Sequence, residues 1–256
     1  GYRNMIASAR NLYILKRLNE SGIVDYKSIA GELGVSEATV RRDFEKLESQ
    51  GKLRRVQGGA VPSGTSGTGF DAELSIRAKN NLNTQEKQLV ARVAAENVEP
   101  GECVYLDTGT SIAPLAQFLL AKPIRIVTCN NLVLQRVKPE SRAEVFIPGG
   151  RFLPADQMIM GAIAESTLEN FAFHRAFISC MGLSVEANTA YVTEMESMKI
   201  KQIAIKNAEK SYLLADSSKL QMVGLLRAAG LDAFEKVYLN GPRPRGEYPA
   251  NMVFVE

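Results

Sequence analysis

The sequence predicts an α/β protein with a small N-terminal helical module and a larger domain built on a mostly parallel sheet. The first 60 residues hold three short amphipathic segments at helical spacing. A run rich in Gly, Ser and Thr follows, which is typical of a flexible linker. From residue 103 onward, apolar runs alternate with amphipathic segments, as in parallel sheets covered by helices. We therefore expect domains at 1–61 and 71–256, joined by a linker at 62–70.

The bulk composition fits this division and excludes several classes of protein. A chain of 256 residues with 45% hydrophobic composition can supply one small and one well-cored large domain. No apolar run approaches the roughly 18 residues of a membrane span, and no signal-peptide pattern opens the chain. Cys103, Cys129 and Cys180 are spaced unlike any metal or redox motif. We expect a cytoplasmic protein with buried, reduced cysteines and without cofactor, metal or membrane association.

The N-terminal module is predicted to contain three helices. The first covers 5–20, the second runs from Tyr26 to Leu33, and Gly34 supplies a tight turn after it. The third begins after Ser36, a good N-cap, and ends at Gly51. Its apolar face is formed by three residues at helical spacing: Val40, Phe44 and Leu47.

This arrangement indicates a winged helix-turn-helix. In this motif the second of the two helices, here the one between Ser36 and Gly51, enters the major groove of DNA. A short strand pair after Gly51 would form the wing. Residues 1–60 contain 11 Lys and Arg against 7 Asp and Glu, while the remainder contains 20 against 21, so the positive excess lies with this module. The alternative is a helical hairpin with a solvated basic face. The residues predicted to bind DNA are Ser36, Thr39, Arg41, Arg42, Lys46, Arg54, Arg55, Gln57, Gly58 and Gly59.

The larger domain is expected to open with a helix from Asn83, after an arm at 70–82 that packs between the domains. Strands and helices then alternate. The predicted strands are 103–107, 125–129, 144–147, 176–180, 212–215, 237–239 and 252–255. The predicted helices pass through 115–119, 133–137, 163–171 and 196–208.

A ligand site is expected at the carboxyl ends of these strands, where open parallel sheets bind ligands. The loops there are small, polar and rich in Gly, most clearly at 107–111 and 216–219. Gly109 allows a sharp turn, and Thr110 and Ser111 offer hydroxyl and amide groups that suit a phosphate. The residues predicted to bind an effector are Asp107, Thr108, Gly109, Thr110, Ser111, Thr128, Asn130, Asn131, Gly149, Gly150, Gly182, Glu194, Lys199 and Lys219.

Roles within this set differ, and simpler interpretations stay open. Asp107, Asn130 and Asn131 could orient sugar hydroxyls, whereas Lys199, Lys201 and Lys219 could neutralise a phosphate. A polar loop can equally be a plain turn, and a helix lysine can be merely solvated. His174 precedes an apolar strand with no acid or nucleophile beside it in the sequence, so we expect a structural role for it.

Two groups of residues resemble the DeoR family of bacterial transcription regulators, and together they span nearly the whole chain. The N-terminal group is Val35-Ser36, Thr39-Val40-Arg41-Arg42-Asp43, Leu47-Glu48, Gly51 and Gly58-Gly59-Ala60. The C-terminal group is 107–111, 128–130, 148–150, Gly161, Gly182, Lys199 and 214–219. Departures from the family pattern are Gln57, where a His is usual, Cys180-Met181 and Leu220-Gln221.

The resemblance implies a sensor domain similar in fold to ribose-5-phosphate isomerase and CoA transferases. It also implies a phosphorylated sugar as effector and oligomers that bind repeated operator sites. The resulting prediction is a repressor of a carbohydrate-use operon that binds double-stranded operator DNA, forms a homo-oligomer and is not an enzyme.

Two alternatives remain open. One is a sugar-phosphate isomerase or transferase with an accessory helix-turn-helix, in which Glu194, Glu196 or Asp107 is the base and Lys219 holds the phosphate. No paired acid and base at a defined spacing supports it. The other is a DNA-binding scaffold that senses nothing.

Overall fold

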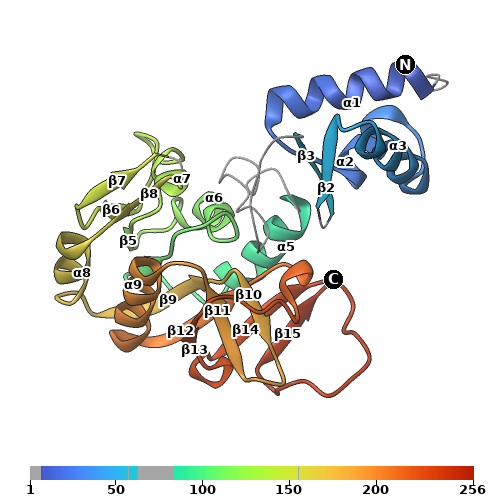
Figure 1. Ribbon diagram of the computed structural model, residues 1–256. Coiled ribbons are helices and arrows are strands. Elements are labelled where there is room, and N and C mark those ends of the chain that lie inside the picture. The colour runs from blue at the N-terminus through green and yellow to red at the C-terminus, as the bar shows by residue number, and fades with distance from the viewer. Residues whose placement is uncertain (1–6, 57, 63–83, 155) are drawn as a thin grey trace. The chain divides into compact units, whose positions relative to one another are not determined.

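The computed structural model describes residues 7–56, 58–62, 84–154 and 156–256. The chain divides into two units, Gly1–Thr84 and Gln85–Glu256 (Figure 1). The predicted arm at 70–82, the predicted linker after its first residue, and Gln57 lie outside the described residues.

The N-terminal unit contains the predicted helices and wing. Its elements are α1 (Ala7–Ser21), β1 (Val24–Asp25), α2 (Tyr26–Leu33), α3 (Glu37–Ser49), β2 (Leu53–Val56) and β3 (Gly59–Pro62). The described strands form an antiparallel sheet in the order β1-β3-β2. Gly34 ends α2 in the left-handed conformation, with φ of 66°, and the Ser36 hydroxyl caps α3 by accepting from the Thr39 amide at 3.2 Å. Phe44 and Leu47 of α3 are fully buried among the other helices.

Gly59 lies where β3 passes closest to β1. A Cβ atom at this position would lie 2.1 Å from the carbonyl oxygen of Val24. We expect Gly59→Ala to destabilise the N-terminal unit by about 1–3 kcal/mol, because the two strands must move apart. Chemical denaturation followed by circular dichroism measures this loss.

Gly31→Ala is the matched control for that substitution. Gly31 lies within α2, and a Cβ atom added there would have no neighbour within 4 Å. Alanine stabilises a helix interior relative to glycine by roughly 0.5–1 kcal/mol, so the control should unfold no earlier than the wild type. Equal unfolding midpoints for Gly59→Ala and the wild type would contradict the close approach.

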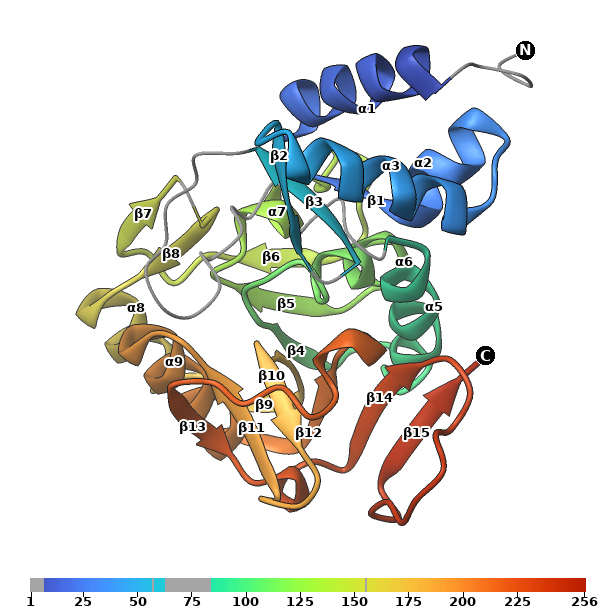
Figure 2. The same cartoon turned by 45° about the vertical axis from the view of Figure 1, so that its right-hand side comes forward.

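The described residues of the second unit form a seven-stranded, wholly parallel sheet in the order β15-β14-β12-β9-β4-β5-β6. Its strands are β4 (Cys103–Leu106), β5 (Arg125–Thr128), β6 (Glu144–Phe146), β9 (Phe173–Ser179), β12 (Ala208–Leu214), β14 (Lys236–Asn240) and β15 (Met252–Val255). The chain runs outward from β4 to β6, then returns to place β9 on the other side of β4 (Figure 2). The strand order therefore reverses between β4 and β9, the kind of position where parallel sheets bind ligands.

Helices cover both faces of this sheet. One face packs on α5 (Thr84–Ala95), η1 (Ala113–Leu115), α6 (Ala116–Leu119) and α7 (Asn131–Leu134), and the other on α8 (Ala162–Leu168) and α9 (Met195–Lys206). Within β4, Val104 and Leu106 face the α5 side and Tyr105 faces the α9 side. This arrangement confirms the predicted α/β class with a parallel sheet.

Short strands that the sequence did not predict lie outside the main sheet. An antiparallel pair is formed by β7 (Arg151–Leu153) and β8 (Met158–Met160). A second antiparallel sheet has the order β10-β11-β13, built from β10 (Gly182–Ser184), β11 (Thr189–Val192) and β13 (Leu226–Ala229). Two further short helices are η2 (Ser217–Lys219) and η3 (Leu231–Ala233). The predicted helix through 133–137 is only the single turn α7.

The cysteines and the histidine have structural surroundings. All three cysteines are free, Cys129 and Cys180 are buried, and Cys103 is half-buried. Burial raises the pKa of Cys129 to about 12 and that of Cys180 to about 11. His174 Nδ1 accepts a hydrogen bond from the Cys103 amide at 3.0 Å, which is a structural contact. Among the described helices, none has the length and apolar character to cross a membrane.

Candidate functional site

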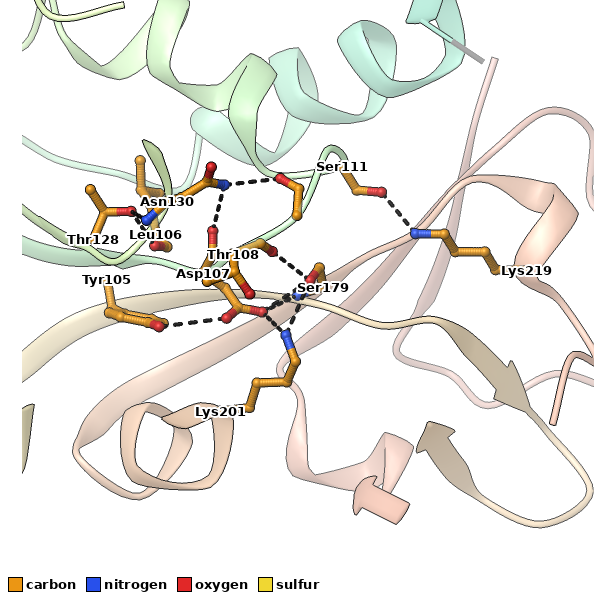
Figure 3. Close-up of polar contacts among 11 residues, drawn as sticks. Tyr105, Leu106, Asp107, Thr108, Ser111, Thr128, Asn130, Ser179, Lys201 and Lys219 are labelled. Atoms are coloured by element: carbon orange, nitrogen blue, oxygen red, sulfur yellow. Dashed lines mark hydrogen bonds and ion pairs between the residues drawn. The ribbon is translucent and has the colours of Figure 1, made fainter. Parts of the chain in front are cut away.

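A buried ion pair lies at the point where the strand order reverses. Asp107 follows β4 and is fully buried, and its Oδ2 forms an ion pair with Lys201 Nζ of α9, which is 2% exposed. The same oxygen accepts hydrogen bonds from the Ser179 amide at 2.8 Å and the Ser179 hydroxyl at 3.0 Å. Ser179 ends β9, so the cluster joins β4, β9 and α9 (Figure 3).

Asp107 therefore differs from its predicted role of orienting sugar hydroxyls. Its carboxylate points into the protein, where Lys201 and Ser179 take Oδ2 and the Tyr105 hydroxyl lies 3.5 Å from Oδ1. A buried carboxylate needs a partner charge, and Lys201 supplies it. Lys201 is thus occupied by Asp107, although the sequence made it a candidate for neutralising a phosphate.

Asn130 holds the loop after β4 against the end of β5. Its Nδ2 donates to the carbonyl oxygens of Asp107 at 3.0 Å and Gly109 at 2.9 Å, and its Oδ1 accepts from the Leu132 amide at 3.0 Å. The Thr128 hydroxyl donates to the Leu106 carbonyl at 2.7 Å and accepts from the Asn130 amide at 3.1 Å. Both side chains are fully engaged within the protein, so they shape the loop.

Gly109 makes this loop turn tightly. Its φ of 101° lies in the left-handed region, and a Cβ there would lie 3.1 Å from Ser179 Oγ. The predicted need for glycine at this turn agrees with the geometry. The turn leads directly to Thr110 and Ser111.

Two lysines converge on these adjacent hydroxyl groups. Lys87 Nζ of α5 donates to Thr110 Oγ1 at 2.9 Å. Lys219 Nζ of η2 donates to Ser111 Oγ at 3.0 Å (Figure 3). Lys87 is 5% exposed and Lys219 is half-buried. Beside them, burial acts to raise the pKa of Asp216, but the Lys219 charge and hydrogen bonds from Ser218 outweigh it and lower that pKa. The result is a cluster of charges around one tight loop.

Lys87 was not among the effector residues predicted from the sequence, although its spacing in the helix could have indicated it. It stands at positions i−3, i−4 and i−7 relative to Val90, Ala91 and Ala94, which are buried residues of α5. A charged residue on the apolar stripe of a helix requires a buried partner. Ser179 was also missed, because a serine at the end of an apolar strand carries no such signal.

The other predicted effector residues are spread more widely. Lys199 has a side chain that is 57% exposed and lies 3.8 Å from Glu165 Oε2, so it belongs to the outer face of α9. Asn131 Nδ2 donates to Gln157 Oε1 at 2.7 Å. Glu194 directly precedes α9, and Gly149 lies between β6 and β7.

Gly150 and Gly182 are required by close packing of the backbone. A Cβ on Gly150 would lie 2.6 Å from the Met160 carbonyl oxygen, and one on Gly182 would lie 2.3 Å from that of Met222. The structure thus brings together the 107–111 loop, Thr128, Asn130 and Lys219, and it assigns Lys199 to the exposed outer face of α9.

In the N-terminal unit, α3 presents the predicted basic side chains to solvent. Arg41, Arg42 and Lys46 are exposed, and the Ser36 and Thr39 hydroxyls lie 2.9 Å apart at the start of the helix. The Arg41 guanidinium lies over the ring of Tyr26, with Cζ 5.0 Å from the ring centroid. These residues form the surface that the sequence predicts for DNA.

Arg55 has a different environment from the one expected of a phosphate contact. Its Nε donates to Glu48 Oε2 at 2.7 Å, and its guanidinium also donates to Glu45 Oε1 at 2.9 Å. Hydrogen bonds from the Arg55 amide and side chain lower the pKa of Glu48. Arg55 therefore ties β2 to α3. In the wing turn, Gly58 is exposed and Gly59 is packed against β1.

Comparison with known protein families decides the identity of both units. The DeoR C terminal sensor domain matches residues 82–240, and the DeoR-like helix-turn-helix domain matches residues 10–64. The chain belongs to the DeoR family. The predicted family is thus confirmed, and with it the class of DNA-binding transcription regulators.

Relatives with similar length share moderate identity with this DeoR-family chain. It is 31% identical over 211 residues to a lactose phosphotransferase system repressor of Streptococcus mutans, covering 81% of each chain. It is 28% identical over 237 residues to the HTH-type transcriptional regulator GlpR of Haloferax volcanii, covering 93% of this chain and 91% of the relative.

Among solved structures, two matches show lower sequence identity to this family member. Ribose-5-phosphate isomerase A of Methanocaldococcus jannaschii shares 17% identity at a TM-score of 0.38, covering 54% of this chain and 55% of the isomerase. The sorbitol operon regulator SorC of Klebsiella pneumoniae shares 11% identity at a TM-score of 0.35, covering 82% and 89%.

Proposed function

We propose that this DeoR-family chain is a repressor of a carbohydrate-use operon whose sensor unit binds a phosphorylated sugar. One observation carries the effector assignment: the ammonium groups of Lys87 and Lys219 meet two adjacent hydroxyls where the strand order reverses. The name of the Streptococcus mutans relative, a repressor of a sugar phosphotransferase system, supports the same class of operon.

The phosphate group would lie at Thr110 and Ser111. Both lysines donate there to neutral hydroxyl oxygens, and a phosphate oxygen is a stronger, charge-assisted acceptor for the same donors. The hydroxyls of Thr110 and Ser111 are then free to turn and donate to the phosphate. The Asp107–Lys201 pair keeps the loop in this shape before the ligand arrives, which lowers the ordering cost of binding.

The sugar would extend from the phosphate toward residues beyond the loop. Asn131 and Glu194 remain our candidates for its hydroxyl groups, and Asn131 would exchange its bond to Gln157 for one to the ligand. Thr128 and Asn130 contribute indirectly, because their bonds hold the loop against β5. The same holds for Asp107, whose burial leaves it a structural role.

Operator DNA would bind along the exposed side of α3. Thr39, Arg41 and Arg42 stand near its N-terminal end, which enters the major groove first in this motif. Arg42 and Lys46 would contact phosphates, which supply affinity, while the few base contacts select the sequence. Arg54 is a candidate for the same role, with its Nε and Nη2 atoms buried in this structure. Arg55 would act by holding the wing against α3.

Control by the effector would operate in a homo-oligomer, in which the sugar phosphate changes the placement of two DNA-binding units. Such control needs a different affinity of the effector for the DNA-bound and free states. An enzymatic role with Asp107 as the base is disfavoured by its full burial against Lys201.

Thermal melting against a panel of sugars and their phosphates tests this proposal. We expect stabilisation by one phosphorylated sugar and not by the same sugar without phosphate, with no product detected by nuclear magnetic resonance. Conversion of the phosphorylated sugar to a product would show that this chain is an enzyme and would overturn its assignment as a sensor. A panel without any stabilising compound would remove the effector assignment.

Arg42→Ala should weaken operator binding and reduce its salt dependence. Loss of one phosphate contact reduces the slope of log K against log salt by about 0.9. The measurement is a titration at several salt concentrations, using a duplex selected from a random library by the wild-type chain. Arg125→Ala is the control, since that arginine is on β5 with a 60% exposed side chain. An unchanged slope for Arg42→Ala would contradict the assignment of Arg42 as a phosphate contact.

A further inference from the structure

Tyr26 lies where three parts of the DNA-binding surface meet. It is the first residue of α2, and its amide donates to the Gly58 carbonyl in the wing turn at 3.1 Å. Its ring packs on Phe44 of α3 with a centroid distance of 5.0 Å. The Arg41 guanidinium, also on α3, lies over the same ring with Cζ 5.0 Å from the centroid. One residue thus connects α2 and α3 through its side chain and the wing through its backbone.

Arg41 can keep its hydrogen-bonding capacity while its guanidinium lies over this ring. A guanidinium stacks through its flat face, while its five N–H donors lie in the plane and point away from the ring. Paired donors in that plane match O6 and N7 of guanine in the major groove. The ring therefore restricts the motion of the side chain without using the donors that read a base.

Restricting the Arg41 side chain before DNA binds raises the affinity of the protein for a specific DNA site. A free arginine loses side-chain entropy on binding, and a side chain that is already held loses less. The attraction between the guanidinium and the aromatic face supplies the hold. Phe44 is fully buried, so its contact with Tyr26 fixes the ring in place.

We propose that Tyr26 is a positioning residue that orients Arg41 for reading a base of the operator. This inference rests on the proposed DNA-binding function and adds to it a residue outside the recognition helix. It predicts that Tyr26 affects specific binding through Arg41 and leaves non-specific binding nearly unchanged, because phosphate contacts depend little on one fixed rotamer.

The test is a double-mutant cycle in the full chain. Dissociation constants are measured at one salt concentration for the wild type, Tyr26→Phe, Tyr26→Leu, Arg41→Ala and the double variant Tyr26→Leu/Arg41→Ala. Two duplexes are used: one selected from a random library by the wild-type chain, and a scrambled duplex of equal length and composition. Tyr26→Met repeats the Leu experiment with another apolar side chain, and circular dichroism compares the fold of each variant.

Tyr26→Leu should weaken binding to the selected duplex by about three- to tenfold, as expected for one side chain that must be ordered on binding. It should change binding to the scrambled duplex by less than about twofold, and Tyr26→Phe, which keeps the ring, should stay within about twofold on both. In the Arg41→Ala background, Tyr26→Leu should cause no further loss.

Equal losses on both duplexes, or fully additive losses in the cycle, would overturn the assignment of Tyr26 and leave the DNA-binding function intact. Unchanged affinity of Arg41→Ala for the selected duplex would also overturn it. Failure of the wild-type chain to select any duplex would instead remove the DNA-binding proposal, and this assignment would fall with it.

Discussion

Replacing Asp107 by alanine is expected to destabilise the sensor unit by about 3–5 kcal/mol. The substitution leaves the Lys201 ammonium buried, with the Ser179 hydroxyl at 3.2 Å as a neutral partner. It also removes the acceptor of the Ser179 amide, and a buried unsatisfied donor carries its own cost. Urea denaturation followed by circular dichroism measures the change in the transition that belongs to the sensor unit.

A second substitution distinguishes the lost ion pair from a simple cavity. The double variant Asp107→Asn/Lys201→Met replaces both charges by neutral groups of similar size. We expect this double variant to be more stable than Asp107→Ala, in which the Lys201 charge stays buried without its partner. The control is Glu144→Ala, which breaks a pair with Arg125 in which both side chains are at least 60% exposed. That loss should be below about 1 kcal/mol. Equal losses at Asp107 and Glu144 would contradict the buried pair.

The helix-turn-helix could be predicted because its signals are local. The Ser36 cap, the left-handed turn at Gly34 and the spacing of Val40 and Phe44 each act within a few residues. β1 was missed because it is only two residues long and forms through pairing with β3, about 35 residues later. A strand of that length has no periodicity of its own.

The candidate effector site was predictable in outline, because the carboxyl ends of parallel strands meet at one edge of the sheet. The partners within it were not. Lys199 and Lys201 are two residues apart, so they point roughly 200° apart around α9, and only one can face the sheet. Which one does so depends on where α9 packs against β9 and β12. The sequence prediction placed Lys199 in the effector site, whereas the structure turns Lys201 inward and Lys199 to the surface.

The sharpest test of the effector site compares lysines that face the 107–111 loop with a lysine on the protein surface. Lys87→Met and Lys219→Met each remove one ammonium group that meets the Thr110–Ser111 hydroxyls and keep a side chain of similar length. A hydrogen bond to a charged group contributes about 1.5–3 kcal/mol. We therefore expect each variant to bind the stabilising sugar phosphate about 10- to 100-fold more weakly, measured by calorimetric titration.

Lys199→Met is the matched control, because it removes the same charge from the exposed face of α9. Its affinity for the sugar phosphate should match the wild type. The unphosphorylated sugar provides the second comparison, since it carries no phosphate group and should stabilise none of the four proteins. Weaker binding by Lys199→Met than by Lys87→Met would move the phosphate away from the 107–111 loop. Equal loss in all three variants would instead indicate only the general attraction of a positive surface for an anion, which falls steeply with added salt. A buried contact at Lys87 is screened far less.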